Sequence, residues 1–323
     1  MFEDLISLAI EKNATDIHIA DGKCVSLRIA NKIEKVSFDK AVIENFWKDL
    51  ETKFPLNLYE KDFSCTTMDG IRLRCNYFLS NGKKSIAIRV LPCYVPNVTE
   101  LSLPPIFSKI ALEHHGLILV SGNVGSGKST TMAAMIEEIN NTRPCHIVTI
   151  EDPIEYIFNE KKSIIHQREV GQDTANFATA TVAALRQDAD VIMIGEIRDE
   201  ATAEAALTAA ETGRLVFATI HSSSTVGVPK RFSELFKSNK SDARNRIARV
   251  FTAIIHQKML FDDMRKPRAV TELLLHTKAV ENCIVDDKET ALQDAISSGG
   301  NFGMFTLKQD TERLTKKFGN LTG

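Results

Sequence analysis

The sequence predicts an α/β protein in which a smaller α+β domain precedes a larger domain built on a parallel sheet. In the first third of the chain, short alternating strands are separated by turn residues. Residues 91–105 then hold four prolines and show little periodicity, which is typical of an extended, fairly stiff linker. Beyond them, short apolar strands alternate with helical segments, a pattern that indicates a parallel sheet covered on both faces.

Composition and charge exclude several classes of protein. Of the 323 residues, 43% are hydrophobic and 25% are charged, which suits a folded globular chain. The formal net charge of −2 gives no sign of a surface that neutralises DNA phosphates, so we expect no stable nucleic-acid binding. No window approaches about 18 consecutive apolar residues, and the acidic, amphipathic start differs from a signal peptide, so we expect a cytoplasmic protein. The six cysteines form no CxxC pair, which disfavours a zinc site.

Residues 1–92 are predicted to form an antiparallel sheet with helices on one side. The spacing of apolar residues predicts helices at 2–12 and 39–53. Alternation predicts strands at 16–19, 25–29, 63–68, 71–79 and 85–90. Turns are predicted at Asp21-Gly22, Asp69-Gly70 and Asn81-Gly82, which are strong hairpin signals. Trp47, in the second helix, is expected simply to pack.

The linker is placed at 93–106 and the second domain at 107–323. Apolar strands are predicted at 117–120, 146–150, 191–194 and 215–220, with helices at 175–187 and 200–212. The C-terminal third is predicted to be mostly helical, with its clearest helix at 242–260, and to pack beside the sheet.

A glycine-rich loop follows the first of these strands and precedes a run of helix formers. Residues 122–129 read GNVGSGKS and fit the pattern GxxxxGK[ST]. The glycines let backbone N–H groups turn toward phosphates, the lysine neutralises the β and γ oxygens, and the serine hydroxyl reaches Mg²⁺. The sequence therefore predicts an ATP phosphate site that consists of Gly122, Asn123, Val124, Gly125, Ser126, Gly127, Lys128, Ser129 and Thr130.

Two acidic segments follow other predicted strands. The strand at 191–194 leads to Glu196, in the position where P-loop NTPases hold the Mg²⁺ shell. A second strand leads into Glu151, Asp152 and Glu155, which lie at the edge of the sheet where ligands bind. Such carboxylates can orient water or take its proton, although a merely solvated acidic loop is the simpler alternative.

Together these motifs resemble those of the hexameric ATPases of type II secretion and type IV pilus systems, and within them the short retraction ATPases of the PilT-like branch. The resemblance covers nearly the whole chain. It rests on Asp16-Ile-His18, the loop at 122–129, and the segments 149–156 (TIEDPIEY), 184–199 (ALRQDADVIMIGEIRD), 212–221 (TGRLVFATIH) and 298–307 (SGGNFGMFTL). Several ordered motifs at family-like spacing are far more specific than any one of them.

The resemblance implies a PAS-like domain joined to a RecA-like ATPase domain, assembled as a homohexamer with ATP at the subunit boundary. It implies that Lys128 and Ser129 bind phosphate and Mg²⁺, and that Glu196 completes the metal site. By the same resemblance, Glu155 is the general base that activates water. The other matched positions are Glu151, Asp152 and His221, which fall in the family's acidic and histidine boxes.

Three arginines in the first domain are also candidates. Arg72 and Arg74 alternate with apolar residues on one predicted strand, so they share the face opposite the apolar one, with Arg89 two strands along. In the family such arginines reach toward a nucleotide held by the adjoining subunit. A solvated sheet face is the alternative.

The chain departs from the family pattern in three places. Asn123 stands where the family usually has proline, which changes the stiffness of the loop but leaves its glycines in place. Arg214 replaces the histidine that normally begins the histidine box, so a permanent cation replaces a titratable ring. Residues 279–284 match the retraction-associated helix signature only loosely, with Glu281 where arginine is expected.

The leading expectation is a motor peripheral to the inner membrane that docks on an inner-membrane pilus platform protein and drives pilus retraction by Mg²⁺-dependent ATP hydrolysis. A pilus-assembly or secretion motor is the first alternative, although such enzymes usually carry a longer N-terminal region and a four-cysteine zinc insertion. The lack of basic patches disfavours a DNA motor. A non-enzymatic, nucleotide-gated subunit is disfavoured because Glu155 and Glu196 are both present.

Overall fold

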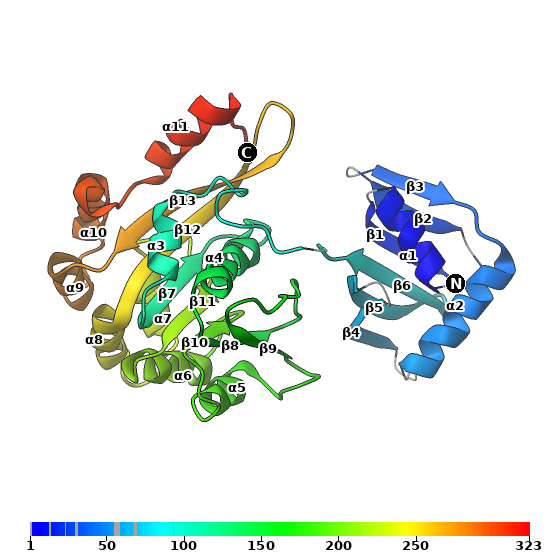
Figure 1. The fold of residues 1–323 in the computed structure, drawn as a ribbon, viewed down its shortest axis with the longest axis horizontal. Helices are drawn as coiled ribbons and strands as arrows, with labels where there is room; N and C mark the ends of the chain where they lie inside the picture. Colours follow the sequence, from blue (N-terminus) through cyan, green and yellow to red (C-terminus); the bar gives the residue numbers. More distant parts are fainter. Residues whose placement is uncertain are drawn as a thin grey trace. The chain divides into compact units, whose positions relative to one another are not determined.

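The computed structural model describes residues 2–12, 14–22, 24–29, 32–54, 59–67, 70–92 and 94–323, with side chains from residue 5 onward. The chain divides into two compact units (Figure 1). One comprises Met1–Tyr94 with Glu155–Ile157, and the other comprises Val95–Ile154 with Phe158–Gly323. Asp69 of a predicted turn and Cys93 at the start of the predicted linker lie outside the described residues.

The first unit is a six-stranded antiparallel sheet with two helices. Its elements are α1 (Phe2–Glu11), β1 (Ala14–Ala20), β2 (Val25–Ile29), β3 (Lys32–Val36), α2 (Lys40–Lys53), β4 (Glu60–Thr66), β5 (Arg72–Ser80) and β6 (Lys83–Val90). The strand order is β3-β2-β1-β6-β5-β4, so the two sets of hairpins meet where β1 pairs with β6. Strand β3 was not among the predicted strands.

One face of this sheet is apolar and carries both helices, as predicted. Along β5, the buried side chains of Leu73, Cys75 and Tyr77 alternate with more exposed ones. From α2, Phe46 and Trp47 are buried in the same core, and the Trp47 ring lies 6.4 Å from that of Tyr77. The predicted packing role of Trp47 is therefore confirmed. The opposite face of the sheet is left to polar side chains.

The second unit is built on a seven-stranded sheet in the order β13-β12-β7-β11-β10-β8-β9. Its elements are α3 (Ile106–Ala111), β7 (Gly116–Ser121), α4 (Lys128–Thr142), β8 (His146–Glu151), β9 (Ile164–Glu169), α5 (Phe177–Ala184), β10 (Val191–Ile194), α6 (Glu200–Glu211), β11 (Leu215–Ile220), α7 (Val228–Glu234), α8 (Lys240–Val250), β12 (Phe251–Phe261), β13 (Pro267–Leu275), α9 (Lys278–Val285), α10 (Glu289–Ser298), η1 (Gly299–Phe302) and α11 (Leu307–Phe318). All pairings except β12 with β13 are parallel. The predicted α/β fold class is confirmed.

Helices cover both faces of this sheet (Figure 1). Strand β7 is buried throughout, with Leu117 and Leu119 in the core cluster beneath α5, α6 and α8. Because side chains alternate along a strand, Ile118 and Val120 face the other layer, which contains α4. Among the described residues, no helix is both long enough and apolar enough to cross a lipid bilayer.

The prediction of one helix at 242–260 is wrong beyond Val250. Helix α8 ends there, and β12 begins at the next residue. Strand β12 pairs in parallel with β7 and antiparallel with β13, so the C-terminal part of the chain extends the central sheet. The run Ala253-Ile254-Ile255 explains the difference. Its side chains are buried on both faces, and stiff β-branched residues pack better in a strand than in a helix.

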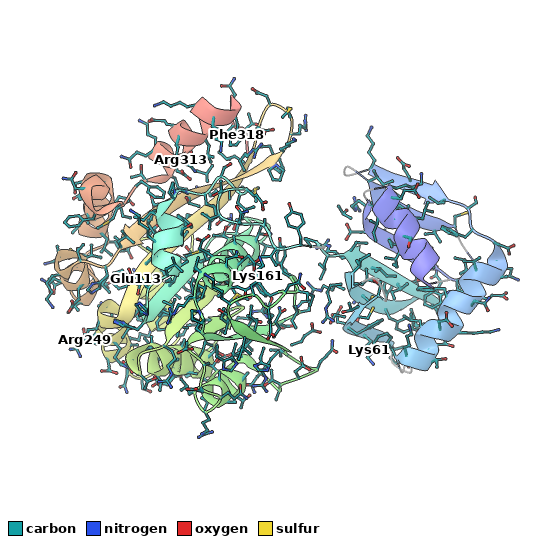
Figure 2. All side chains as sticks on the ribbon, viewed as in Figure 1. Lys61, Glu113, Lys161, Arg249, Arg313 and Phe318 are labelled. Atoms are coloured by element: carbon teal, nitrogen blue, oxygen red, sulfur yellow. The ribbon has the colours of Figure 1, made fainter. Side chains whose placement is uncertain are left out.

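Helix α11 packs on β13 of this hairpin (Figure 2). Asp310 is only 2% exposed, and its Oδ2 accepts hydrogen bonds from the Thr271 N–H at 2.7 Å and the Thr271 hydroxyl at 2.9 Å. Its Oδ1 accepts a hydrogen bond from Arg313 Nε at 2.6 Å. Near the end of the helix, the guanidinium of Arg268 on β13 lies 3.6 Å from the centre of the Phe318 ring.

We expect Asp310→Ala to destabilise the second unit by about 3 kcal/mol, because it leaves the buried donors of Thr271 and the partly exposed Arg313 guanidinium without their acceptor. The free energy of unfolding in urea measures the effect. Lys308→Ala, on an exposed position of the same helix, serves as the control and should cost no more than about 0.5 kcal/mol. Equal stability of the two variants would contradict the anchoring role of Asp310.

Candidate functional site

Four parallel strands of the second unit end at one edge of the sheet. Strand β7 pairs with β11 up to Ser121 and Ile220, and Ile194 of β10 pairs with both β11 and β8. The segments that leave these ends carry the glycine-rich loop, Glu196, His221 and the acidic segment after β8. Because ligands of open α/β sheets bind at this edge, these residues define the candidate site.

The loop between β7 and α4 requires glycine at its first and last positions. Gly122 has a φ of +143°, and a Cβ there would stand 2.3 Å from the carbonyl oxygen of Gln257. Gly127 has a φ of +84°, and a Cβ there would stand 3.0 Å from side-chain atoms of Gln257 and Met259. Any other residue would therefore strain the backbone and push the loop away from β12. Gly125, with a φ of +80°, faces open space.

Lys128 closes the loop at the start of α4. Its Nζ donates hydrogen bonds to the carbonyl oxygens of Gly122 at 2.9 Å and Asn123 at 3.0 Å. The Ser126 N–H donates to the same Asn123 oxygen at 3.2 Å, so the loop is curled tightly. The first N–H groups of a helix have no acceptors within it, and the helix dipole is positive at that end. The curled backbone of the loop, the Lys128 ammonium and the amino end of α4 together fit the phosphates of a nucleotide.

Strand β12 holds the loop in place through the side chain of Gln257, which is fully buried. Its Nε2 donates a hydrogen bond to the Ser126 carbonyl oxygen at 2.5 Å, and its Oε1 accepts one from the Thr131 hydroxyl at 2.8 Å. One amide therefore joins the loop, the following helix and the neighbouring strand. The preceding residue, His256, contacts Ser121 at the end of β7, with 3.0 Å between Nδ1 and Oγ.

Glu196, two residues beyond β10, lies at the centre of a charged group. Its Oε2 lies 2.6 Å from Arg198 Nη2, and its Oε1 lies 3.1 Å from His221 Nε2. The hydrogen bond to Glu196 raises the pKa of the Arg198 guanidinium above its ordinary value, and the charges of Glu196 and Asp152 act in the same direction. Segments from β8, β10 and β11 therefore meet around one carboxylate.

The three carboxylates at the end of β8 and just beyond it differ in exposure. Glu151 is buried, and its Oε1 accepts hydrogen bonds from the Thr149 hydroxyl at 2.7 Å and from Gln167 Nε2 at 3.4 Å. Asp152 is exposed and precedes Pro153 through a cis peptide bond. Glu155 follows and is half-buried.

Comparisons with known proteins agree with this geometry. The family described as "Type II/IV secretion system protein" matches residues 60–293. The type IV pilus retractation ATPase PilT of Pseudomonas aeruginosa is 34% identical over 322 residues, which cover 97% of this chain and 94% of that protein. The uncharacterized protein YggR of Escherichia coli is 36% identical over 312 residues, or 95% and 96% of the two chains. A crystal structure of the pilus retraction motor PilT with bound ADP superimposes with a TM-score of 0.85, at 37% identity over 99% of this chain and 94% of that one.

The chain belongs to the type II/IV secretion system protein family. With its P-loop, this membership identifies it as an ATPase. The resemblance to PilT-like retraction ATPases that the motifs predict is confirmed along nearly the whole length of the chain. The structural match to PilT with bound ADP supports nucleotide binding by this member of the family.

Arg214 was predicted from its position in the family's histidine box. Within this chain it lies far from the phosphate loop. Arg214 comes immediately before β11 and His221 immediately after it, so they stand at opposite edges of the sheet, roughly 20 Å apart. The Arg214 guanidinium donates a hydrogen bond to the Thr212 carbonyl oxygen at 2.7 Å. Within one chain, Arg214 and the phosphate loop do not share a site.

The three predicted arginines lie on the polar face of the first unit's sheet. Arg74 on β5 stands directly opposite Arg89 on β6, so the expectation that Arg89 lies two strands away is wrong. Arg89 Nε donates a hydrogen bond to Asp16 Oδ1 at 2.9 Å. Arg72 Nη2 donates one to the Ser64 hydroxyl at 2.6 Å.

Sequence reasoning did not single out Arg198, His256 or Gln257. Arg198 had a signal, because it lies two residues after Glu196 in the matched segment 184–199. His256 and Gln257 had no such signal, since they fall in the segment that was predicted to be helical.

We expect Gly122→Ala to weaken nucleotide binding at least tenfold, because its Cβ would collide with the Gln257 carbonyl oxygen and displace the loop. Titration of the purified protein with a fluorescent ADP analogue measures the affinity. Gly300→Ala, where a Cβ meets open space, is the matched control and should bind as the wild type does. Unchanged affinity in Gly122→Ala would show that the loop does not need its close approach to β12.

Proposed function

We propose that this protein is the ATP-hydrolysing motor of type IV pilus retraction, working as a homohexamer. The observation that carries the proposal is the joint presence of the glycine cradle at 122–129 and the Glu196 group at one edge of the sheet. Similarity to the retractation ATPase of Pseudomonas aeruginosa over 97% of this chain supports the direction of the motor.

The residues at this edge fit a magnesium nucleotide. The backbone of 122–129, the Lys128 ammonium and the amino end of α4 would bind the phosphates. The Ser129 hydroxyl, in the first turn of α4, and the Glu196 carboxylate would hold Mg²⁺, which usually keeps several waters and takes only one or two protein ligands. An ion held there would neutralise charge on the phosphate oxygens.

Other side chains would supply the rest of the chemistry. Glu155 would accept the proton of the attacking water as general base. Arg198 and His221 hold the two oxygens of Glu196 and so fix the direction of that carboxylate. The charge of Asp152 acts on Arg198, as the charge of Glu196 does. This interaction connects the acidic segment to the group around Glu196.

The first unit would contribute through a second copy of the chain. Arg74 and Arg89 stand directly opposite each other, and like charges in this position repel. Asp16 offsets only part of this charge, through Arg89. An anionic group from outside the sheet would relieve the remainder, and the phosphates of an adjoining subunit's nucleotide are the anion we propose. The pair would thus complete the site across a subunit boundary, with Arg72 beside it.

The proposed motor would act in the cytoplasm at the inner face of the inner membrane, on a pilus platform protein. Retraction requires that closure of the ring's subunits on ATP is transmitted to such a partner.

We expect Glu155→Gln to lower kcat for ATP hydrolysis at least a hundredfold while ATP binding stays within about threefold of wild type, because the amide keeps the shape but cannot take a proton. Phosphate release and nucleotide titration measure the two quantities. Glu113→Gln, at the opposite edge of the sheet, is the control and should hydrolyse ATP normally. Wild-type turnover in Glu155→Gln would remove Glu155 from the proposed mechanism.

Deletion of the gene in its host should leave cells with excess surface pili that do not retract. Restoring the wild-type gene should reverse this, and restoring Lys128→Ala should not, because the phosphate loop would lack its lysine. Pilus counts by electron microscopy and twitching assays provide the measurement. Bald cells after deletion would instead make the protein an assembly motor.

A further inference from the structure

A histidine lies buried next to the phosphate loop, in the strand that supports it. His256 on β12 is 2% exposed, and its Nδ1 lies 3.0 Å from the Ser121 hydroxyl. The same hydroxyl donates a hydrogen bond to the Ile255 carbonyl oxygen at 3.2 Å. Because a hydroxyl has one hydrogen, its oxygen is left to accept from His256 Nδ1–H. With the Ser121 hydrogen directed to Ile255, we assign the tautomer that carries the proton on Nδ1.

The other ring nitrogen is unusual. His256 Nε2 is buried and has no hydrogen-bond partner among the described residues. Its cross-strand neighbour is Glu272, which is also buried. The oxygens of Glu272 accept hydrogen bonds from the Thr225 hydroxyl at 2.6 Å and from the Leu307 N–H at 3.3 Å. An apolar residue would fill this place without leaving a buried nitrogen unpaired, so packing alone does not account for histidine here.

The contact to Ser121 lies directly before the loop. Ser121 is the last residue of β7, and the next residue, Gly122, offers its carbonyl oxygen to Lys128. A short path of contacts therefore runs from the His256 ring through Ser121 and Gly122 to the lysine ammonium. Any shift in Ser121 would move the first residue of the phosphate cradle.

We propose that His256 is a positioning residue for the phosphate loop, which it holds through the hydrogen bond from Nδ1–H to Ser121. The inference rests on the proposed binding of ATP phosphates at 122–129. It adds to that function a residue outside the loop that sets nucleotide affinity without touching the nucleotide.

The ring performs this role in its neutral form. Burial lowers the pKa of His256 below its ordinary value; the charge of Glu272 opposes that shift, and Lys258 and Lys128 add to it. A neutral ring keeps one donor and one acceptor, so the donor at Nδ1 stays directed to Ser121.

Three substitutions separate the two ring nitrogens. In His256→Asn the amide nitrogen lies where Nδ1–H lies, in His256→Gln it lies nearer to Nε2, and His256→Leu keeps only bulk. We expect His256→Asn to hold KM for ATP and the dissociation constant for ADP within about threefold of wild type. His256→Gln and His256→Leu should raise both about tenfold or more, with kcat at saturating ATP changed by less than about twofold, because only the binding of the loop's ligand is weakened.

Ser121→Ala provides an independent test, because it removes the other partner of the bond with little change in volume. It should raise KM by the same factor as His256→Gln, and the double variant should be no worse than either single one. Thr252→Ala, at the far end of β12, is the control and should leave KM unchanged.

Equal KM values in the wild type, His256→Gln and Ser121→Ala would overturn the proposal, as would an equal rise in His256→Asn and His256→Leu. Loss of kcat and thermal stability with an unchanged KM would also overturn it, since that result indicates a purely structural role. Failure of the wild type itself to bind ATP, or undiminished binding by Lys128→Ala, would contradict the proposed function instead. The two failures are therefore distinguishable.

Discussion

The candidate site depends first on how closely the phosphate loop approaches β12. The backbone of Gly122 lies so near the Gln257 carbonyl oxygen that no Cβ fits between them. In return, the Gln257 amide bonds to both the loop and α4, at Ser126 and Thr131. A flexible glycine loop gains a fixed shape only through such contacts, because glycine loses more conformational freedom on ordering than any other residue. The cradle is thus shaped largely by a strand that belongs to the C-terminal part of the chain.

That dependence gives the C-terminal part a role in the site. The bond between Gln257 and Ser126 joins residues 131 positions apart in the sequence. Strand β12 is itself held by β13, and β13 is anchored to α11 through Thr271 and Asp310. Glu272 on β13 adds a link between the His256 position and the amino end of α11 at Leu307. Hydrogen bonds and strand pairing therefore connect the last helix to the phosphate loop.

The phosphate loop and four central strands could be predicted from short stretches of sequence. The glycine spacing after an apolar strand located the loop, and the short apolar runs located β7, β8, β10 and β11 within a residue or so. Local sequence was insufficient for β12, because Ala253-Ile254-Ile255 becomes a strand only where β7 offers it an open edge. The grouping of Glu196 with Arg198 and His221 likewise depends on β10 and β11 being neighbours, which residue spacing does not specify. Arg214 was predicted as a site residue only because of its position in the family motif. In the structure, the whole length of β11 separates it from the phosphate loop.

The most direct test of the central claim is the rate of phosphate release by the purified wild-type protein, compared with that of Lys128→Ala, with and without Mg²⁺. The account predicts steady ATP hydrolysis by the wild type that stops when Mg²⁺ is chelated, and a rate at least a hundredfold lower in Lys128→Ala, because the ammonium that neutralises the β and γ oxygens is gone. Hydrolysis that persists without Mg²⁺, or at the wild-type rate in Lys128→Ala, would contradict the assignment of this edge of the sheet as the ATPase site.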